Sequence, residues 1–278
     1  MKEPRKTIAR LAAATLTAGL LGPCTALAVP LNGLIGLYTF DAADGTDSSG
    51  ANNHGTVGTG VGFTATGGGV DGGIAADFSV LSTGANPTAN AANAIVLPID
   101  INASSLPQLT MGAWVRPDTT GEGGAGKVFS HDNGSFDRTL GIDPRSGGPG
   151  YALFTGTGVL NANPVVPFVL GDWQFIAARY DGATARLTVG GTTLSATDNT
   201  DFDTGFGSLF VGANPFFNED FDGLVDNVFV YDRALTDQEL DDIRLNGVLA
   251  QNVPEPGVAG LLLAGLVLTA VRRRRSNP

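Results

Sequence analysis

The sequence predicts an all-β protein, an antiparallel sandwich of short strands with one short helix near its C-terminal end. Three observations lead to this prediction. Short stretches of alternating apolar and polar residues recur along the chain, as expected for strands with one buried face. The 278 residues include 40 glycines and 15 prolines, which favour turns between such stretches. A single segment carries both the start and the stop signals of a helix.

Eleven strands are predicted in order along the chain, separated by Gly, Asn, Asp and Pro. They cover residues 34–40, 74–80, 94–99, 109–116, 127–131, 138–143, 151–155, 173–180, 184–189, 207–213 and 224–232. The strands 173–180 and 184–189 form a hairpin, because Asp181 and Gly182 lie in the short turn between them. The glycine-rich stretch 55–73 is expected to be a long loop.

The predicted helix begins at Thr236. Thr236 and Glu239 form a capping box, in which each side chain accepts a hydrogen bond from the backbone of the other residue. Leu240, Ile243 and Leu245 are expected to bury one face of the helix, and residues 246–247 end it. This helix should cover an edge or an end of the sandwich.

Residues 1–28 are predicted to be a Sec-type signal peptide. Four cations in the first ten residues precede an uncharged, mostly apolar run, and Ala26 and Ala28 supply small residues for cleavage after Ala28. Residues 21–24 also loosely resemble a lipobox, in which case Cys24 would carry a lipid anchor. If Cys24 leaves with the signal, the exported domain, residues 29–250, contains no cysteine and no disulfide.

The charge of the exported part is strongly negative. Residues 29–253 hold 8 cations and 25 carboxylates, a net charge of −17, because the other cations lie at the two ends of the chain. Such a surface repels phosphate backbones and anionic headgroups and attracts divalent cations. The charge therefore excludes nucleic-acid binding and makes calcium a reasonable partner.

The C-terminal end carries three features in a fixed order. Pro254, Glu255 and Pro256 come first, then an uncharged segment, 257–271, and then four arginines, which are Arg272, Arg273, Arg274 and Arg275. Fifteen helical residues reach about 22 Å, less than the ~30 Å hydrocarbon core of a bilayer. The arginines would hold the tail in the cytoplasm, as in a plain C-terminal anchor.

This order also resembles the PEP-CTERM sorting signal, here residues 253–276 with a transmembrane segment at 257–271. The resemblance implies an exosortase as partner and an inner-membrane precursor in a Gram-negative bacterium. It further implies removal of the tail and delivery to the cell surface or the extracellular matrix.

Four motifs between residues 33 and 248 together resemble a laminin-G-like, concanavalin A-type jelly roll. They are LYTFD at 37–41 with the loop 47–56, TMGAWVRP at 110–117, DWQFIAARYDG at 172–182 and FDGLVDNVFVYDRAL at 221–235. One departure is Asn227, which stands where the family usually has Glu. The resemblance implies that the first and last strands lie near one another.

A structural calcium site is expected at Asp41 and Asp226, which lie on those two strands, with Asp47 as a weaker candidate. Calcium takes six to eight oxygen ligands, and two carboxylates with backbone carbonyls would fasten the two chain ends together. Without a metal, backbone N–H groups would satisfy Asp226 and solvent would surround Asp41.

Catalysis is not expected. The two histidines, His54 and His131, lie in no nucleophile elbow or metal-ligand spacing, and His54 is expected to shape a turn. The Glu-x-Asp-x-x-Glu pattern of hydrolases in the resembled superfamily is absent. Residues 121–127 have P-loop spacing but lack the Ser or Thr that must follow the lysine. Trp114 and Trp173 are expected to be buried in the core.

The sequence thus predicts an exported, non-catalytic jelly-roll module that binds glycan, exopolysaccharide or another matrix polymer. Phe216 and Phe217 lie in a loop and are the candidate ligand-contacting aromatics. The alternative is a purely structural envelope or biofilm protein that engages other proteins, and a less favoured one is a polysaccharide-degrading enzyme.

Overall fold

A computed structural model of the chain describes residues 31–79, 91–200 and 204–248. The predicted signal peptide, residues 1–28, and the predicted sorting signal with its apolar segment lie outside the described residues. Within the described part, none of the helices has the length and apolar character needed to cross a membrane.

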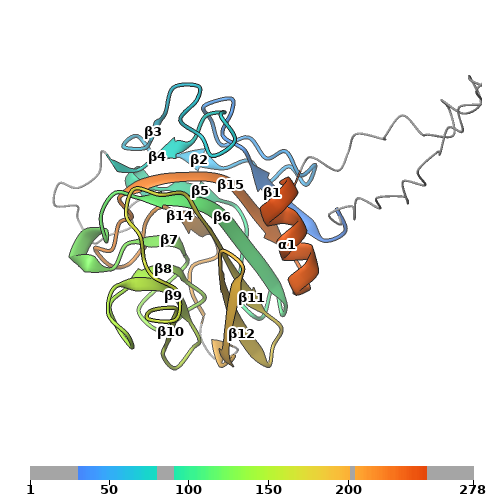
Figure 1. Ribbon diagram of the computed structural model, residues 1–278. Helices are drawn as coiled ribbons and strands as arrows, with labels where there is room; N and C mark the ends of the chain where they lie inside the picture. The colour runs from blue at the N-terminus through green and yellow to red at the C-terminus, as the bar shows by residue number, and fades with distance from the viewer. Residues whose placement is uncertain (1–30, 80–90, 201–203, 249–278) are drawn as a thin grey trace, which may run out of the picture.

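Two antiparallel sheets make up the fold (Figure 1). In sheet A the strand order is β13-β12-β11-β6-β15-β4-β3, and β1 also pairs with β15. The bounds of these strands are β1 (Leu34–Tyr38), β3 (Gly62–Phe63), β4 (Ala76–Asp77), β6 (Leu109–Pro117), β11 (Gln174–Tyr180), β12 (Thr184–Val189), β13 (Thr192–Thr197) and β15 (Gly223–Tyr231).

Sheet B has the order β10-β9-β8-β7-β14-β5-β2. Its strands are β2 (Thr56–Val57), β5 (Ile95–Leu97), β7 (Lys127–Ser130), β8 (Leu140–Asp143), β9 (Gly150–Phe154), β10 (Val159–Asn161) and β14 (Leu209–Val211). The long strands β6 and β15 pair side by side in sheet A, so the first, central and last parts of the chain meet there. The predicted antiparallel β-sandwich is confirmed.

The main core lies between the two sheets. Met111, Ala113 and Val115 on β6 point into it, as do Phe129 and Leu153 from sheet B. The residues between them point away, because neighbours along a strand face opposite sides. The sandwich therefore has two outer faces, one on sheet A and one on sheet B.

Helix α1 (Asp237–Asn246) covers part of the outer face of sheet A, beside β1 and β15 (Figure 1). Its predicted capping box is present, with the Glu239 backbone N–H donating to the Thr236 hydroxyl. Leu240 and Ile243 are buried against sheet A as predicted. The prediction for Leu245 was wrong: its side chain is 66 % exposed, because it lies about 200° around the helix from Ile243 and faces away from the sheet.

Four strands were not predicted from the sequence: β2, β3, β10 and β13. The strands β2 and β3 are two-residue segments inside the predicted glycine-rich loop. Strand β13 is the edge strand of sheet A, and its residues are mostly exposed and polar. It pairs with β12 through its backbone along six residues, and an apolar alternation pattern cannot detect such a strand.

Candidate functional site

A pocket of about 210 Å³ lies on the outer face of sheet B; it is called the aromatic pocket below. Phe154, the last residue of β9, follows the inward-pointing Leu153 and so faces outward. The other lining residues come from the three loops that follow β7, β8 and β14. The full lining is Asp132, Gly134, Ser135, Phe136, Arg145, Phe154, Phe217 and Glu219.

A network of ion pairs holds the charged side of the aromatic pocket in place. Lys127 Nζ lies 2.8 Å from Asp143 Oδ2 and 3.5 Å from Glu219 Oε2. Arg145 binds the same Asp143 carboxylate through Nε and Nη2, and its guanidinium carbon lies 5.1 Å from the centroid of the Phe154 ring. Burial alone would raise the pKa of Asp143, but the hydrogen bonds from Arg145 and Lys127 outweigh it and hold that pKa at about 2.

Asn214 connects two carboxylates of the aromatic pocket. Its amide donates to Asp132 Oδ2 at 3.1 Å and to Glu219 Oε2 at 2.9 Å. Asp132 Oδ1 accepts two further hydrogen bonds from backbone N–H groups of its own loop. Glu219 Oε1 has only a distant partner among the described residues, Arg145 Nη2 at 3.9 Å. Glu219 Oε1 is therefore available to accept a hydrogen bond from a ligand.

The two predicted ligand-contacting aromatics lie at this pocket. Phe216 and Phe217 are 45 % and 40 % exposed, and their rings pack edge to face with centroids 4.9 Å apart. Phe217 lines the pocket, whereas Phe216 stands beside it and contacts the Gly134 region. The backbone N–H groups of both residues donate to Asn214 Oδ1, so the loop that carries the two rings is fixed to the same amide as the carboxylates.

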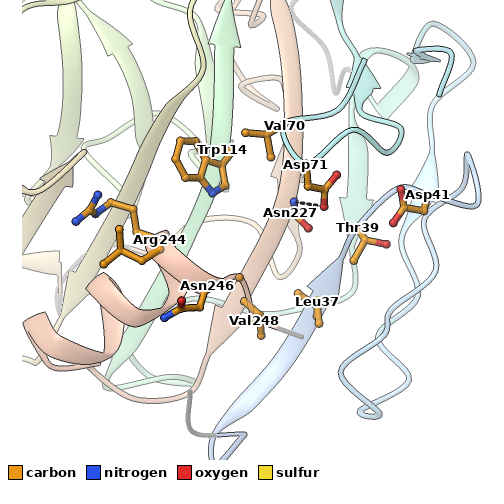
Figure 2. A pocket seen from close by; sticks show the side chains of 12 residues that line it. Leu37, Thr39, Asp41, Val70, Asp71, Trp114, Asn227, Arg244, Asn246 and Val248 are labelled. Carbon is orange, nitrogen blue, oxygen red and sulfur yellow. Dashed lines mark hydrogen bonds between the residues drawn. The ribbon is translucent and has the colours of Figure 1, made fainter. Parts of the chain in front are cut away.

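A second, larger cavity of about 550 Å³ lies on the outer face of sheet A; it is called the indole cavity below (Figure 2). Its walls come from β1, the glycine-rich loop, β6, β15 and the end of α1. The lining residues are Leu37, Thr39, Asp41, Val70, Asp71, Trp114, Asn227, Arg244, Leu245, Asn246, Gly247 and Val248. Figure 2 shows Trp114 on one side of the cavity and the Asp71–Asn227 hydrogen bond across from it.

Trp114 and Trp173 are both half-buried, so neither is fully enclosed as predicted, although Trp114 packs against the apolar cluster beneath α1. Trp114 pairs with Phe175 across β6 and β11 and belongs to the outer face of sheet A. A strand pattern cannot distinguish the two faces when a helix covers one of them.

The structure brings Asp41 and Asp226 to the same place, together with Asp71, which was not predicted. Asp226 is 1 % exposed and accepts hydrogen bonds from the backbone N–H groups of Val70 and Asn227. Burial, with the nearby charges of Asp71 and Asp41, raises the pKa of Asp226 to about 7. No cationic side chain pairs with Asp226 among the described residues, so a cation would relieve this charge.

The glycine-rich loop wraps closely around these carboxylates. A side chain at Gly69 would come within 2.7 Å of Asp226 Oδ2, and one at Gly73 would collide with Asp41. Within the described residues, however, no group of three or more His, Cys, Asp and Glu side chains is arranged to hold a metal ion. An ion here would therefore need oxygens other than the three carboxylates in their present positions.

Asp47 lies elsewhere and is fully used by its own loop. Its carboxylate accepts from the backbone N–H groups of Leu37, Ser49 and Asn53 and from the Ser49 hydroxyl, at 2.8–3.0 Å. Burial would raise the pKa of Asp47, but these hydrogen bonds hold it below its usual range. The Asp47 N–H donates to His54 Nδ1 at 3.1 Å, so His54 shapes this turn as predicted.

The fold and the two pockets define a lectin-like β-sandwich. Residues 88–241 match the Laminin_G_3 family model, described as the concanavalin A-like lectin/glucanases superfamily, and the chain belongs to this family. None of the curated protein sequences compared with the chain matches it.

Three solved structures illustrate the likeness. Domain 4 of the arabinanase AbnA from Geobacillus stearothermophilus, in complex with arabinotriose, has 21 % identity and a TM-score of 0.52, over 76 % of this chain and 98 % of that one. Trypanosoma rangeli sialidase has 14 % identity and a TM-score of 0.53, over 81 % and 34 %. The botulinum neurotoxin serotype D ligand binding domain, in complex with N-acetylneuraminic acid, has 13 % identity and a TM-score of 0.53, over 79 % and 52 %. At these identities the likeness establishes the fold alone.

Proposed function

We propose that this protein is an exported, non-catalytic glycan-binding module that acts at the cell surface or in the extracellular matrix. The observation that carries the proposal is the aromatic pocket, where the exposed ring of Phe217 stands beside the polar groups of Arg145 and Glu219. Sugars are bound in proteins by this combination, since their C–H faces pack on aromatic rings while their hydroxyls pair with fixed polar groups.

The free hydrogen-bonding groups of the aromatic pocket suit a sugar hydroxyl. Arg145 uses Nε and Nη2 on Asp143, which leaves Nη1 as a donor, and Glu219 Oε1 is a free acceptor. A sugar hydroxyl can accept a hydrogen bond from Arg145 Nη1 and donate one to Glu219 Oε1. The pocket volume of about 210 Å³ lies below the ~300 Å³ of typical ligand sites and suits one sugar unit.

Two of the similar structures carry sugars: arabinotriose in the arabinanase domain and N-acetylneuraminic acid in the neurotoxin domain. They support glycans as the ligand class for this chain. A glycan array probed with the purified chain tests the proposal. Binding to a defined set of sugars is expected, and a flat array together with self-association would instead favour a purely structural protein.

Export and exosortase sorting are part of the same proposal and are supported by the order of features at the two chain ends. Cell fractionation tests them. The mature chain should leave the inner membrane without its C-terminal tail, and a full-length chain retained stably in that membrane would contradict sorting.

A structural calcium ion is proposed beside Asp226, with Asp41 and Asp71 as further ligands in place of Asp47. Binding would require these carboxylates to shift from their present positions and backbone carbonyl oxygens to complete the ligand set. The buried, uncompensated charge of Asp226 and the close glycine-rich loop support this site. The ion would supply positive charge there and tie β1, the glycine-rich loop and β15 together.

Glycoside hydrolysis is the competing function, because Asp132 and Glu219 line one pocket as two carboxylates. A glycosidase needs one of its two carboxyl groups protonated to act as the general acid. Asp132 accepts three hydrogen bonds, and Glu219 lies 3.5 Å from the Lys127 ammonium. Both carboxyl groups are thus held by donors of the protein itself, and these contacts favour a binding role over catalysis.

A further inference from the structure

Trp114 leaves part of its indole uncovered in the indole cavity. Its ring packs edge-on against Phe175, with centroids 5.7 Å apart. Helix α1 joins Phe175 and Phe229 in one apolar cluster but ends at Asn246, before it can cover the indole fully. The cavity beyond the helix end, about 550 Å³, falls within the size range of ligand pockets in proteins.

Unused polar groups surround this indole. The amide of Asn246 is exposed and has no hydrogen-bond partner among the described residues. Arg244 uses Nε and Nη2 on Asp241, which leaves Nη1 as a donor. Across the cavity, the Asn227 amide donates to Asp71 Oδ2 at 3.3 Å, and its carbonyl oxygen remains an acceptor. The cavity therefore offers an aromatic face with donors and acceptors on both sides, as the aromatic pocket does.

The two hollows lie on opposite faces of the sandwich. Trp114 stands between Ala113 and Val115, which point into the core, and therefore faces outward from sheet A. Phe154 follows Leu153, which points into the core from the other side, and therefore faces outward from sheet B. One short ligand cannot reach both positions, because the whole core lies between them.

We propose that the indole cavity is a second glycan-binding site, so that one chain holds two glycan segments at once, one on each outer face. This proposal rests on the glycan-binding function proposed for the aromatic pocket. The ligand class is an uncharged oligosaccharide, because the net charge of −17 over residues 29–253 repels polyanions. Two sites that face opposite directions would make a single chain a cross-linker of matrix polymers.

The test is the number of sugars bound per chain, measured by titration calorimetry on the purified full-length chain. The probes are arabinotriose, xylotriose, cellotriose and mannotriose, each with and without calcium. Asn246→Trp fills the mouth of the indole cavity from an exposed helix position, and Gln238→Trp is its matched control on the same helix, away from the cavity lining. Phe217→Ala removes the wall of the aromatic pocket.

The wild-type chain and Gln238→Trp should bind two trisaccharides per chain, and Asn246→Trp and Phe217→Ala one each. Trp114→Ala should match Asn246→Trp, with thermal unfolding as the check that it folds. Light scattering with soluble arabinan or xylan should show cross-linking by the wild type and none by either single-site variant. If the wild type binds one sugar per chain and Asn246→Trp still binds one, the second site is overturned while the proposed function stands. If the wild type binds one sugar per chain, Phe217→Ala still binds it and Asn246→Trp does not, both the two-site proposal and binding at the aromatic pocket are overturned.

Discussion

The ammonium group of Lys127 lies 2.8 Å from the carboxylate of Asp143, and both side chains are 1 % exposed. Lys127 begins β7 and Asp143 ends β8, so the pair fastens two neighbouring strands of sheet B. The same two residues position Glu219 and Arg145, which line the aromatic pocket. A buried ion pair costs a large desolvation free energy, and here it also fixes the polar side of the candidate ligand site.

Replacing Asp143 should destabilise the chain more than replacing Lys127. Asp143→Asn leaves two cations, Lys127 and Arg145, without their shared carboxylate, and should lower the free energy of unfolding by about 3–5 kcal/mol. Lys127→Met should cost less, because Arg145 still pairs with Asp143. Urea unfolding at neutral pH measures both values, and the opposite order would contradict this account of the network.

The Lys127–Asp143 pair also predicts a loss of folding stability at acid pH. Since the pKa of Asp143 is held at about 2, against 3.8 in an unfolded chain, its contribution is complete above about pH 4 and is lost as the pH falls toward 2. The stability difference between the wild type and Asp143→Asn should shrink over that window.

His131 predicts a separate pH dependence. Burial lowers its pKa to about 4, with Arg138 adding to the shift, and the Nε2 atom has no hydrogen-bond partner among the described residues. A folded-state pKa below the unfolded value of about 6.5 means that stability is complete above pH 6.5 and falls as the pH drops toward 4. The total loss should be on the order of 3 kcal/mol.

The measurement for His131 is the difference between the wild type and His131→Phe, followed by urea unfolding from pH 7.5 to pH 4. Taking the difference removes the opposite contribution of Asp226, whose raised pKa favours the folded chain as the pH falls through the same window. A difference that stays constant over this range would rule out a buried neutral histidine.

Calcium should raise the melting temperature of the wild-type chain at millimolar concentration, and Asp226→Asn should abolish that rise. Without calcium, Asp226→Asn should change the melting temperature little. It removes a buried charge that has no cationic partner among the described residues, but it also leaves the backbone N–H of Val70 or Asn227 without an acceptor. Asp47→Asn is the matched control: it should lower the melting temperature through its own loop but leave the calcium-induced rise intact. If calcium does not raise the melting temperature of the wild type, the proposed calcium site is contradicted.

Catalysis should be absent from the aromatic pocket. Purified exopolysaccharide and neutral oligosaccharides should show no new reducing ends after incubation with the chain. Asp132→Asn and Glu219→Gln are the decisive variants if turnover does appear, because loss of turnover in both would assign glycoside hydrolysis to this pair. Turnover that survives in both variants would point to a contaminating enzyme.

Much of the fold could be predicted from local patterns. The capping box at Thr236 and Glu239 is a complete signal within four residues, and the alternation along β6 and β15 follows directly from their buried face. The face of the sheet on which Trp114 lies could not be predicted in the same way. An apolar strand residue gives the same sequence pattern whether it is covered by the opposite sheet or by a helix. The prediction for Leu245 failed because its helical position was misjudged: it lies two residues after Ile243, about 200° around the helix, and so faces solvent.

The sites were predicted only in part. Phe217 was named as a candidate because it lies in a predicted loop. Asp41 and Asp226 were named because the family resemblance brings the first and last strands together, and β1 does pair with β15. Asp132, Arg145 and Glu219 were missed, since the three come from separate loops and converge only when β7, β8 and β14 pair in sheet B. Asp71 was missed because it lies in a glycine-rich loop with no strand pattern to fix its position.

The central claim is that this chain binds glycan through the aromatic pocket. Its most direct test compares sugar affinities of the wild type, Phe217→Ala and the matched control Phe206→Ala, which removes a ring of similar exposure outside the pocket. On the sugar that gives the strongest array signal, Phe217→Ala should weaken binding at the aromatic pocket at least about tenfold, the equivalent of about 1.4 kcal/mol, and Phe206→Ala should leave it unchanged. Equal affinities for all three chains would contradict the claim.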